Sequence, residues 1–144
     1  MLNKYIEGRE FSVGIVGNDD ISILPIQEID MSEIPEGLLK FYSFEVKAYY
    51  KSHVKYHFPA RLNDDERKII EEVAVKAYKS LLLKDYARVD IILSDGVPHV
   101  LEINSLPGLM ANYSSLYRMA ETFDLKYEGL IYKIVDEARK RYDI

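Results

Sequence analysis

The sequence predicts an α+β fold in which a mainly antiparallel sheet carries helices on one side. Two pairs of strand-like segments are each separated by a turn signal, a pattern typical of antiparallel hairpins. Two long segments repeat apolar residues at helical spacing, which is typical of amphipathic helices. The chain has 144 residues, of which 48% are hydrophobic and 30% charged. We therefore expect one domain, residues 1–144, built around a single core.

The N-terminal part of the sequence predicts a hairpin followed by a weakly patterned stretch. Residues 10–17 and 21–26 read as strands on either side of the turn signal at residues 18–20. From residue 27 to residue 62 the pattern weakens, apart from a strand expected around residues 41–47. A long irregular stretch inside a compact domain is usually functional, for example as a lid over a site.

Three helices are predicted in the rest of the chain. The first begins after Asn63 as N-cap, has Glu66 at its third helical position, and runs to about Leu83. A short helix is expected over residues 115–123 and a final helix over residues 127–142. The apolar residues of the first helix recur at helical spacing, and we assign them to the core rather than to a site.

A second hairpin carries the polar residues that point to chemistry. Its first strand contains Arg88 and Asp90, and its second strand contains Glu102 and Asn104. Residues two apart in a strand share a face, so the members of each pair point the same way. Carboxylate and amide oxygens suit a hard cation such as Mg²⁺, and a nearby guanidinium suits phosphoryl transfer. The sequence therefore predicts a metal-assisted phosphoryl-transfer site, with an ordinary solvent-facing hairpin as the alternative.

The length of the turn at Asp95-Gly96 decides whether these side chains converge. A two-residue turn with unbroken pairing would place Asp90 opposite Leu101 and would turn Glu102 to the other face. A three-residue loop would instead pair Asp90 with Glu102, and so would a bulge that compensates for a two-residue turn. The metal hypothesis therefore requires an odd loop or a bulge.

Composition excludes several classes of function. The net charge of −5 argues against a general nucleic-acid binder, which usually shows a basic excess. The absence of cysteine excludes disulfides, thiolate catalysis and cysteine-based zinc sites. No apolar run approaches the roughly 18 residues of a membrane span, and the N-terminus lacks the apolar region of a signal peptide. We therefore expect no membrane association and a cytoplasmic location.

Three motifs in the sequence resemble those of the ATP-grasp ligases, and within them the D-alanine–D-alanine ligase group. They are Arg88-x-Asp90 with Glu102-x-Asn104-x-x-Pro107-Gly108, the segment from Tyr5 to Val13, and Phe44-Glu45-Val46-Lys47 with Phe58-Pro59-Ala60. The resemblance covers nearly the whole chain but only the C-terminal portion of such an enzyme. It implies the C-terminal subdomain of the ATP-grasp fold, without the N-terminal half, and a chain inactive on its own.

The resemblance also implies an activity and a role for each motif residue. Such ligases join two amino acids, here in peptidoglycan biosynthesis, through an acylphosphate, and release ADP and phosphate. Two Mg²⁺ ions, or Mn²⁺, would accompany ATP. The implied roles are metal binding by Asp90, Glu102 and Asn104; oxyanion stabilisation by Arg88 and the amide of Gly108; ATP binding by the backbone near Ile6 and by Glu10, Lys47 and Leu101; and binding of the second amino acid by Ser115, or alternatively Ser114.

Two departures from the family pattern leave the substrate open. The run after Gly108 is two residues longer than in the ligases, and aligning back from Met119 places Ser115 at the position of the substrate-binding serine. The segment 48–50 lacks the tyrosine expected directly after Lys47. A ligase for another carboxylate and amine pair is therefore an alternative, as are a non-catalytic nucleotide- or metal-binding module, a metal-dependent phosphohydrolase and a structural domain. Apolar surface exposed by the missing half would also allow a homodimer.

Overall fold

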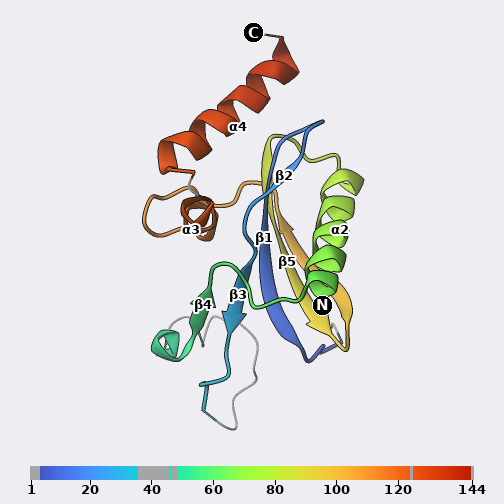
Figure 1. The fold of residues 1–144 in the computed structure, drawn as a ribbon, viewed down its shortest axis with the longest axis vertical. Coiled ribbons are helices and arrows are strands. Elements are labelled where there is room, and N and C mark those ends of the chain that lie inside the picture. The colour runs from blue at the N-terminus through green and yellow to red at the C-terminus, as the bar shows by residue number, and fades with distance from the viewer. Residues whose placement is uncertain (1–3, 36–45, 47–48, 124, 144) are drawn as a thin grey trace.

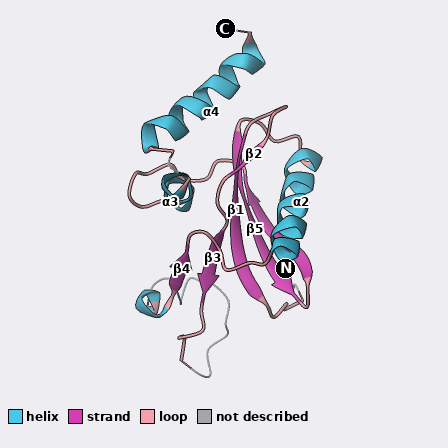
Figure 2. Cartoon of the chain, in the orientation of Figure 1, coloured by secondary structure: helices cyan, strands magenta, loops and turns pink. Residues whose placement is uncertain are grey.

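The computed structural model describes residues 4–35, 46, 49–123 and 125–143. Within this part of the chain, six antiparallel strands form one sheet in the order β4-β3-β1-β5-β6, with β2 also paired to β1 (Figure 1). The strands are β1 (Arg9–Val16), β2 (Ser22–Ile23), β3 (Gln27–Asp30), β4 (Lys55–His57), β5 (Tyr86–Ser94) and β6 (Val97–Asn104). The helices are the 3₁₀ turn Lys51–His53, α2 (Asp64–Ser80), α3 (Ser115–Thr122) and α4 (Tyr127–Tyr142). The predicted α+β class with a mainly antiparallel sheet is confirmed (Figure 2).

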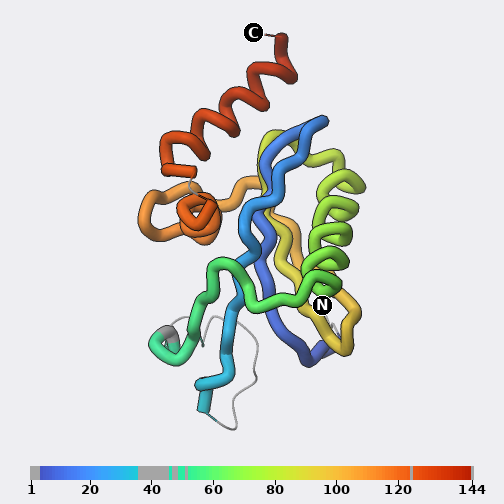
Figure 3. Tube along the Cα trace, in the orientation of Figure 1, coloured from blue at the N-terminus to red at the C-terminus, as the bar shows by residue number. Residues whose placement is uncertain are grey.

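The helices divide between the two faces of the sheet instead of sharing one side. Figure 3 shows α2 on one side of β1 and β5, with α3 and α4 on the other. Strand β1 is buried along both faces: Phe11, Val13 and Ile15 belong to the α2 side, whereas Val16 packs in the α3 and α4 cluster. A strand covered on both faces shows no regular polar alternation, which is why this strand lacks a solvent-facing row.

Close approach of α3 to the sheet depends on a glycine in β1. A Cβ atom added at Gly14 would lie 2.8 Å from Cδ1 of Leu116 and 3.0 Å from Sδ of Met119, both on α3. Those distances are shorter than ordinary van der Waals contact, so any larger residue would push α3 away. Gly14 therefore sets how near α3 lies to the polar residues of β1 and β5.

The predicted elements agree with the structure except in the N-terminal half. Of the strand expected over residues 21–26, only the short β2 forms, and β3 follows after Pro25 in the stretch that was expected to be weakly patterned. The capping box of α2 is present: the Asn63 side chain accepts from the backbone N–H of Glu66, and the Glu66 side chain accepts from that of Asn63. The strand expected around residues 41–47 lies outside the described residues, apart from Val46. None of the described helices is long and apolar enough to cross a membrane.

A buried carboxylate fastens the loop before α2 to the sheet. Glu28 in β3 has a side chain only 3% exposed, and it accepts hydrogen bonds from Arg9 and Arg61. Arg61 also donates its backbone N–H to Glu28, and its side chain reaches Asp30. Burial raises the pKa of Glu28, but the hydrogen bonds from Arg61 and Arg9 lower it by more, so this pKa lies below its ordinary value of 4.5.

We expect Glu28→Gln to lower the free energy of unfolding by about 2 kcal/mol at neutral pH, because an amide cannot replace a carboxylate between two guanidinium groups. Since the folded pKa is depressed, this contribution is present above about pH 4.5 and is lost as the pH falls below it. Urea unfolding of wild type and variant, at about pH 7 and about pH 3, measures both effects.

Glu33→Gln is the matched control for this series. Glu33 also pairs with a cation, Lys55, but its side chain is 52% exposed, and exposed pairs contribute little. The control should unfold almost as the wild type does at either pH. A Glu28→Gln deficit that stays constant across the pH range would contradict the role assigned to this carboxylate.

Candidate functional site

The candidate site is created by a bulge in the β5–β6 hairpin. Ser94 pairs with Val97, and Asp95 and Gly96 between them have φ values of 49° and 76°, so the turn has two residues of the left-handed kind. The register then shifts between Asp90 and Ile91, because Ile91 pairs with Val100 but Asp90 pairs with Glu102. The compensating bulge required by the metal hypothesis is therefore present.

Leu101 is the extra residue of this bulge. Successive residues of a regular strand point to opposite faces, yet Leu101 and Glu102 both line the same cavity. The bulge thus brings an apolar side chain and a carboxylate to one face side by side. It also pairs Arg88 with Asn104, which is the pairing that a three-residue loop would have produced as well.

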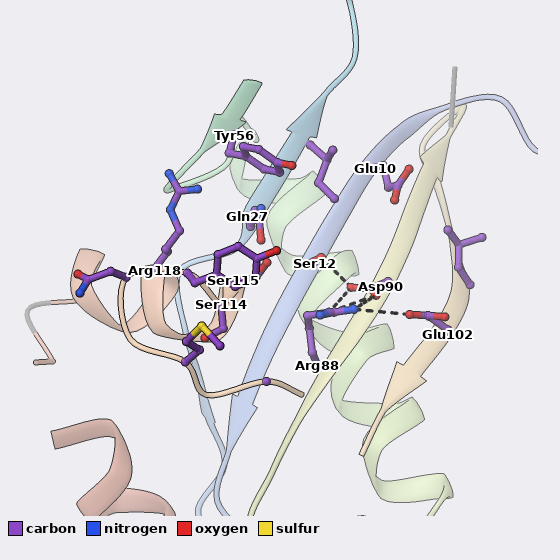
Figure 4. Close-up of a pocket in the computed structure, with 16 residues that line it drawn as sticks. Glu10, Ser12, Gln27, Tyr56, Arg88, Asp90, Glu102, Ser114, Ser115 and Arg118 are labelled. Atoms are coloured by element: carbon purple, nitrogen blue, oxygen red, sulfur yellow. Dashed lines mark hydrogen bonds and ion pairs between the residues drawn. The ribbon is translucent and has the colours of Figure 1, made fainter. Parts of the chain in front are cut away.

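Polar side chains converge where β1, β5 and β6 run together, and Figure 4 shows four of them: Ser12, Arg88, Asp90 and Glu102. The Arg88 guanidinium donates to both oxygens of Asp90, with Nε–Oδ1 and Nη2–Oδ2 distances of 2.8 Å and 2.7 Å. Ser12 of β1 donates its hydroxyl to Asp90 Oδ1 at 2.6 Å. Nη2 of Arg88 also lies 3.5 Å from Oε1 of Glu102. The same Glu102 oxygen accepts a hydrogen bond from the Asn104 side-chain amide at 3.2 Å. One cation therefore balances two carboxylates, which leaves a net negative charge.

A cavity of about 700 Å³ opens beside this cluster. Its lining combines the polar face of the sheet with the segment that leads into α3. The lining residues are Glu10, Ser12, Gln27, Ile29, Tyr56, Arg88, Asp90, Leu101, Glu102, Gly108, Met110, Asn112, Tyr113, Ser114, Ser115 and Arg118. The volume is in the range of small-molecule sites.

Most of the residues singled out in the sequence meet at this cavity. Eight of them line it: Glu10, Arg88, Asp90, Leu101, Glu102, Gly108, Ser114 and Ser115. Asn104 is absent from the lining but contacts Glu102. Ile6 lies in the segment before β1 and does not line the cavity. Lys47 lies outside the described residues.

The two serines at the start of α3 have different structural roles. Ser114 is the N-cap of α3, and its hydroxyl oxygen accepts a hydrogen bond from the backbone N–H of Tyr117 at 3.4 Å. Ser115 is the first helical residue, and within the described residues its hydroxyl has no hydrogen-bond partner. The loop before them is held by Asn112, which has a φ of 60° and accepts from the Tyr117 hydroxyl. Ser115 therefore offers the hydroxyl that the helix does not use.

Eight of the sixteen lining residues were not singled out in the sequence, among them Ser12, Gln27 and Arg118. Ser12 lies two residues from Glu10 in β1, so strand alternation alone places both on the cavity face. Gln27 and Arg118 reach the cavity from β3 and α3, and no motif marks them. For Arg118 the available signal was its position one helical turn after Ser115.

The donor atoms at the β5–β6 end suit a hard divalent cation. Asp90 and Glu102 supply carboxylate oxygens and Asn104 an amide oxygen, the ligand types that Mg²⁺ prefers. Within the part of the chain described, no group of three or more histidine, aspartate or glutamate side chains is placed to hold a metal ion. The Asn104 amide would therefore have to complete a three-residue set, and Arg88 would have to give up one Asp90 oxygen.

Comparison with known proteins gives relatives along nearly the full chain. A family model described as D-ala D-ala ligase C-terminus matches residues 1–136. The D-alanine–D-alanine ligase of Fervidobacterium nodosum is 32% identical over 142 residues, which cover 98% of this chain and 42% of that enzyme. An uncharacterized protein of Sinorhizobium fredii, y4sG, is 34% identical over 143 residues, covering 99% of this chain and 41% of that protein.

Comparison with solved structures identifies the same family of ligases. The crystal structure of the Bacillus anthracis D-alanine–D-alanine ligase complexed with ATP matches with a TM-score of 0.74 and 26% identity, covering 97% of this chain and 41% of that one. The chain thus spans 41–42% of the length of these curated relatives. It belongs to the family described as D-ala D-ala ligase C-terminus, and its sheet and helices are those of the ATP-grasp ligases.

Proposed function

We propose that this chain is the ATP- and Mg²⁺-binding part of a ligase that joins a carboxylate to an amine through an acylphosphate. The observation that carries the proposal is the convergence of Arg88, Asp90 and Glu102 on one cavity, which only the bulge at Leu101 permits. Family membership supports ligase chemistry, and the solved relative from Bacillus anthracis is complexed with ATP.

The nucleotide would bind along the β1 and β6 side of the cavity. Leu101 presents an apolar side chain, 48% exposed, against which a purine ring can pack. Glu10 lines the same cavity and would accept hydrogen bonds from the ribose hydroxyls. The backbone near Ile6, which does not line the cavity, and the side chain of Lys47, which lies outside the described residues, complete the proposed nucleotide contacts.

Asp90, Glu102 and Asn104 would hold Mg²⁺ beside the phosphates. Bound Mg²⁺ would neutralise phosphate charge, as divalent cations do in phosphoryl transfer. Asp90 is 12% exposed at its side chain and already carries the bidentate contact with Arg88. Binding of the cation at Asp90 would take over part of that charge balance and free N–H groups of Arg88 for the substrate.

Arg88 and the backbone N–H of Gly108 would stabilise the negative charge that develops when the amine attacks the acylphosphate. Both line the cavity, Arg88 from β5 and Gly108 from the loop after β6. A fixed guanidinium and a backbone amide act as preorganised donors toward a developing oxyanion. Ser115 would position the acceptor amino acid, since its hydroxyl is not engaged by the α3 cap.

The chain spans only part of the length of its curated relatives. It corresponds to 42% of the Fervidobacterium nodosum ligase, and the remaining part of such an enzyme has no counterpart here. We therefore propose that ligation requires an additional N-terminal half, and that this chain contributes a preformed nucleotide and metal half-site. Binding, not turnover, is accordingly the property to measure on the chain itself.

The first test of the proposal is a calorimetric titration of Mg²⁺-ADP into wild type, Asp90→Asn and Asp95→Asn. Asp90→Asn should weaken metal-dependent binding by about tenfold or more, because one charge at the metal is removed. Asp95→Asn removes the same charge from the turn of the same hairpin, where asparagine tolerates the left-handed backbone, and it should bind as the wild type does.

Thermal unfolding of all three proteins shows whether each variant is folded. Equal Mg²⁺-ADP affinity in a folded Asp90→Asn protein and in the wild type would refute the metal role. An absence of Mg²⁺-ADP binding to the wild-type chain would refute the preformed half-site.

A second prediction separates the two serines. Ser114→Ala should lower the free energy of unfolding by about 1 kcal/mol through loss of the N-cap, with little direct effect on ligand contacts. Ser115→Ala should leave stability nearly unchanged, since alanine is well tolerated in a helix, but should weaken binding of D-alanine. Urea unfolding and NMR titration with D-alanine measure the two effects, and the reverse pattern would assign substrate binding to Ser114.

A further inference from the structure

Arg118 places a preorganised cation in the cavity, on the side opposite Asp90. It lies on α3 one turn after Ser115 and lines the same cavity. Its guanidinium carbon is 4.8 Å from the ring centre of Phe58 and 5.5 Å from that of Tyr56. Figure 4 shows the side chain reaching toward Tyr56, away from the Arg88 cluster. Stacking on aromatic rings fixes the guanidinium plane and leaves the N–H groups at its rim available.

The charge of Arg118 is not balanced within the described structure. Arg9 and Arg61 bind Glu28, Arg88 binds Asp90, and Arg141 binds Asp85. Among the described residues no carboxylate lies within ion-pair distance of Arg118. A cation held by neutral rings beside a cavity can receive an incoming carboxylate without first breaking an ion pair.

A buried, unsatisfied acceptor lies at the same end of the cavity. Gln27 of β3 is 2% exposed, lines the cavity, and its carboxamide oxygen has no hydrogen-bond partner among the described residues. Figure 4 shows it between Tyr56 and Ser12, on the Ser115 side. Leaving a buried acceptor unpaired is costly, so such an atom in a cavity wall indicates a place where a ligand donor can bind.

We propose that Arg118 binds a carboxylate of the acceptor substrate and that Gln27 accepts an N–H from the same molecule. The proposal rests on the proposed ligase function, because it names two side chains of this chain, Arg118 and Gln27, that would bind the acceptor of that reaction. Arg118 then determines specificity at one end of the cavity, while Asp90 and Glu102 serve the phosphates at the other. The carboxylate can be the α-carboxylate or a side-chain carboxylate, and the probes below distinguish the two.

Four probes titrated into the chain test the proposal: D-alanine, D-alaninamide, D-aspartate and D-asparagine. Binding is followed by NMR, including the Nε–H signals of the arginine side chains, in wild type, Arg118→Gln and Arg67→Gln. Arg67 lies on α2, on the opposite face of the sheet, and its variant controls for the loss of one arginine. Arg118→Gln should weaken the binding of the probe whose carboxylate contacts Arg118 by about tenfold or more. Arg67→Gln should leave the affinity for that probe unchanged.

The pairs of probes identify which carboxylate is bound. An α-carboxylate contact makes D-alanine bind better than D-alaninamide, and Arg118→Gln removes that difference. A side-chain contact makes D-aspartate bind better than D-asparagine, and Arg118→Gln removes that difference instead. The proposal is overturned if no carboxylate probe binds the wild type, or if Arg118→Gln preserves the wild-type affinities.

Gln27→Met provides a second readout that a purely structural role would not give. Methionine fills a similar volume without a buried acceptor, so we expect the variant to be at least as stable as the wild type and to bind the same probes more weakly. Unchanged probe affinity in this variant would remove Gln27 from the proposed contact.

A parallel Mg²⁺-ADP titration separates this inference from the proposed function. Arg118→Gln should bind Mg²⁺-ADP as the wild type does, and a loss of nucleotide affinity would assign Arg118 to the nucleotide and overturn the inference. If Mg²⁺-ADP binds but the probes show no dependence on Arg118, only the inference fails. If the probes depend on Arg118 but Mg²⁺-ADP does not bind, carboxylate recognition stands and the nucleotide half-site fails.

Discussion

The extra residue at Leu101 is the constraint on which the site depends. The turn at Asp95-Gly96 is fixed at two residues by its left-handed backbone, so uninterrupted pairing would direct Glu102 toward the apolar side that α2 covers. A carboxylate there would face apolar side chains, where burying a charge is costly. The bulge avoids that burial and, by the same shift, sets Glu102 opposite Asp90. Stability of the hairpin and convergence of the polar groups are therefore consequences of one backbone irregularity.

The second requirement is that the same face of the sheet be covered at one end and open at the other. Strand β1 provides this, because Gly14 lets α3 pack closely while Ser12 and Glu10, further along the strand, remain at the cavity. Helix α3 then brings Ser115 and Arg118 over the sheet opposite the β5–β6 cluster. A sheet with all its helices on one side would leave the carboxylates on an open surface without a cavity.

Local signals were enough to predict α2, α3 and α4, the capping box of α2 and the second hairpin, because each depends on residues a few positions apart. The number of residues in the turn left two ways for Asp90 and Glu102 to share a face, an odd loop or a bulge. Choosing between them requires the cross-strand pairing, which the spacing of residues along the sequence does not reveal. The unbroken apolar character of residues 13–16 was a signal that both faces of β1 are covered. Spacing from Ser115 indicates which side of α3 Arg118 occupies, but its contacts with Tyr56 and Phe58 could not be predicted, because only the tertiary fold brings those rings to it.

The two ends of the cavity hold their charges in opposite ways, and the difference matters for chemistry. At the β5–β6 end, Nε and Nη2 of Arg88 both donate to Asp90. A cation bound to the phosphates must therefore compete with the Arg88 guanidinium for the Asp90 carboxylate. At the α3 end, Arg118 rests on aromatic faces that cannot accept its N–H groups strongly, and no carboxylate among the described residues pairs with it, so its charge is available to a ligand. If Arg118 were paired with a carboxylate of the protein, the binding free energy of an acceptor would be only the difference between the new ion pair and the one that it replaces. Holding a cation on rings therefore fixes its position while keeping its binding energy for the substrate.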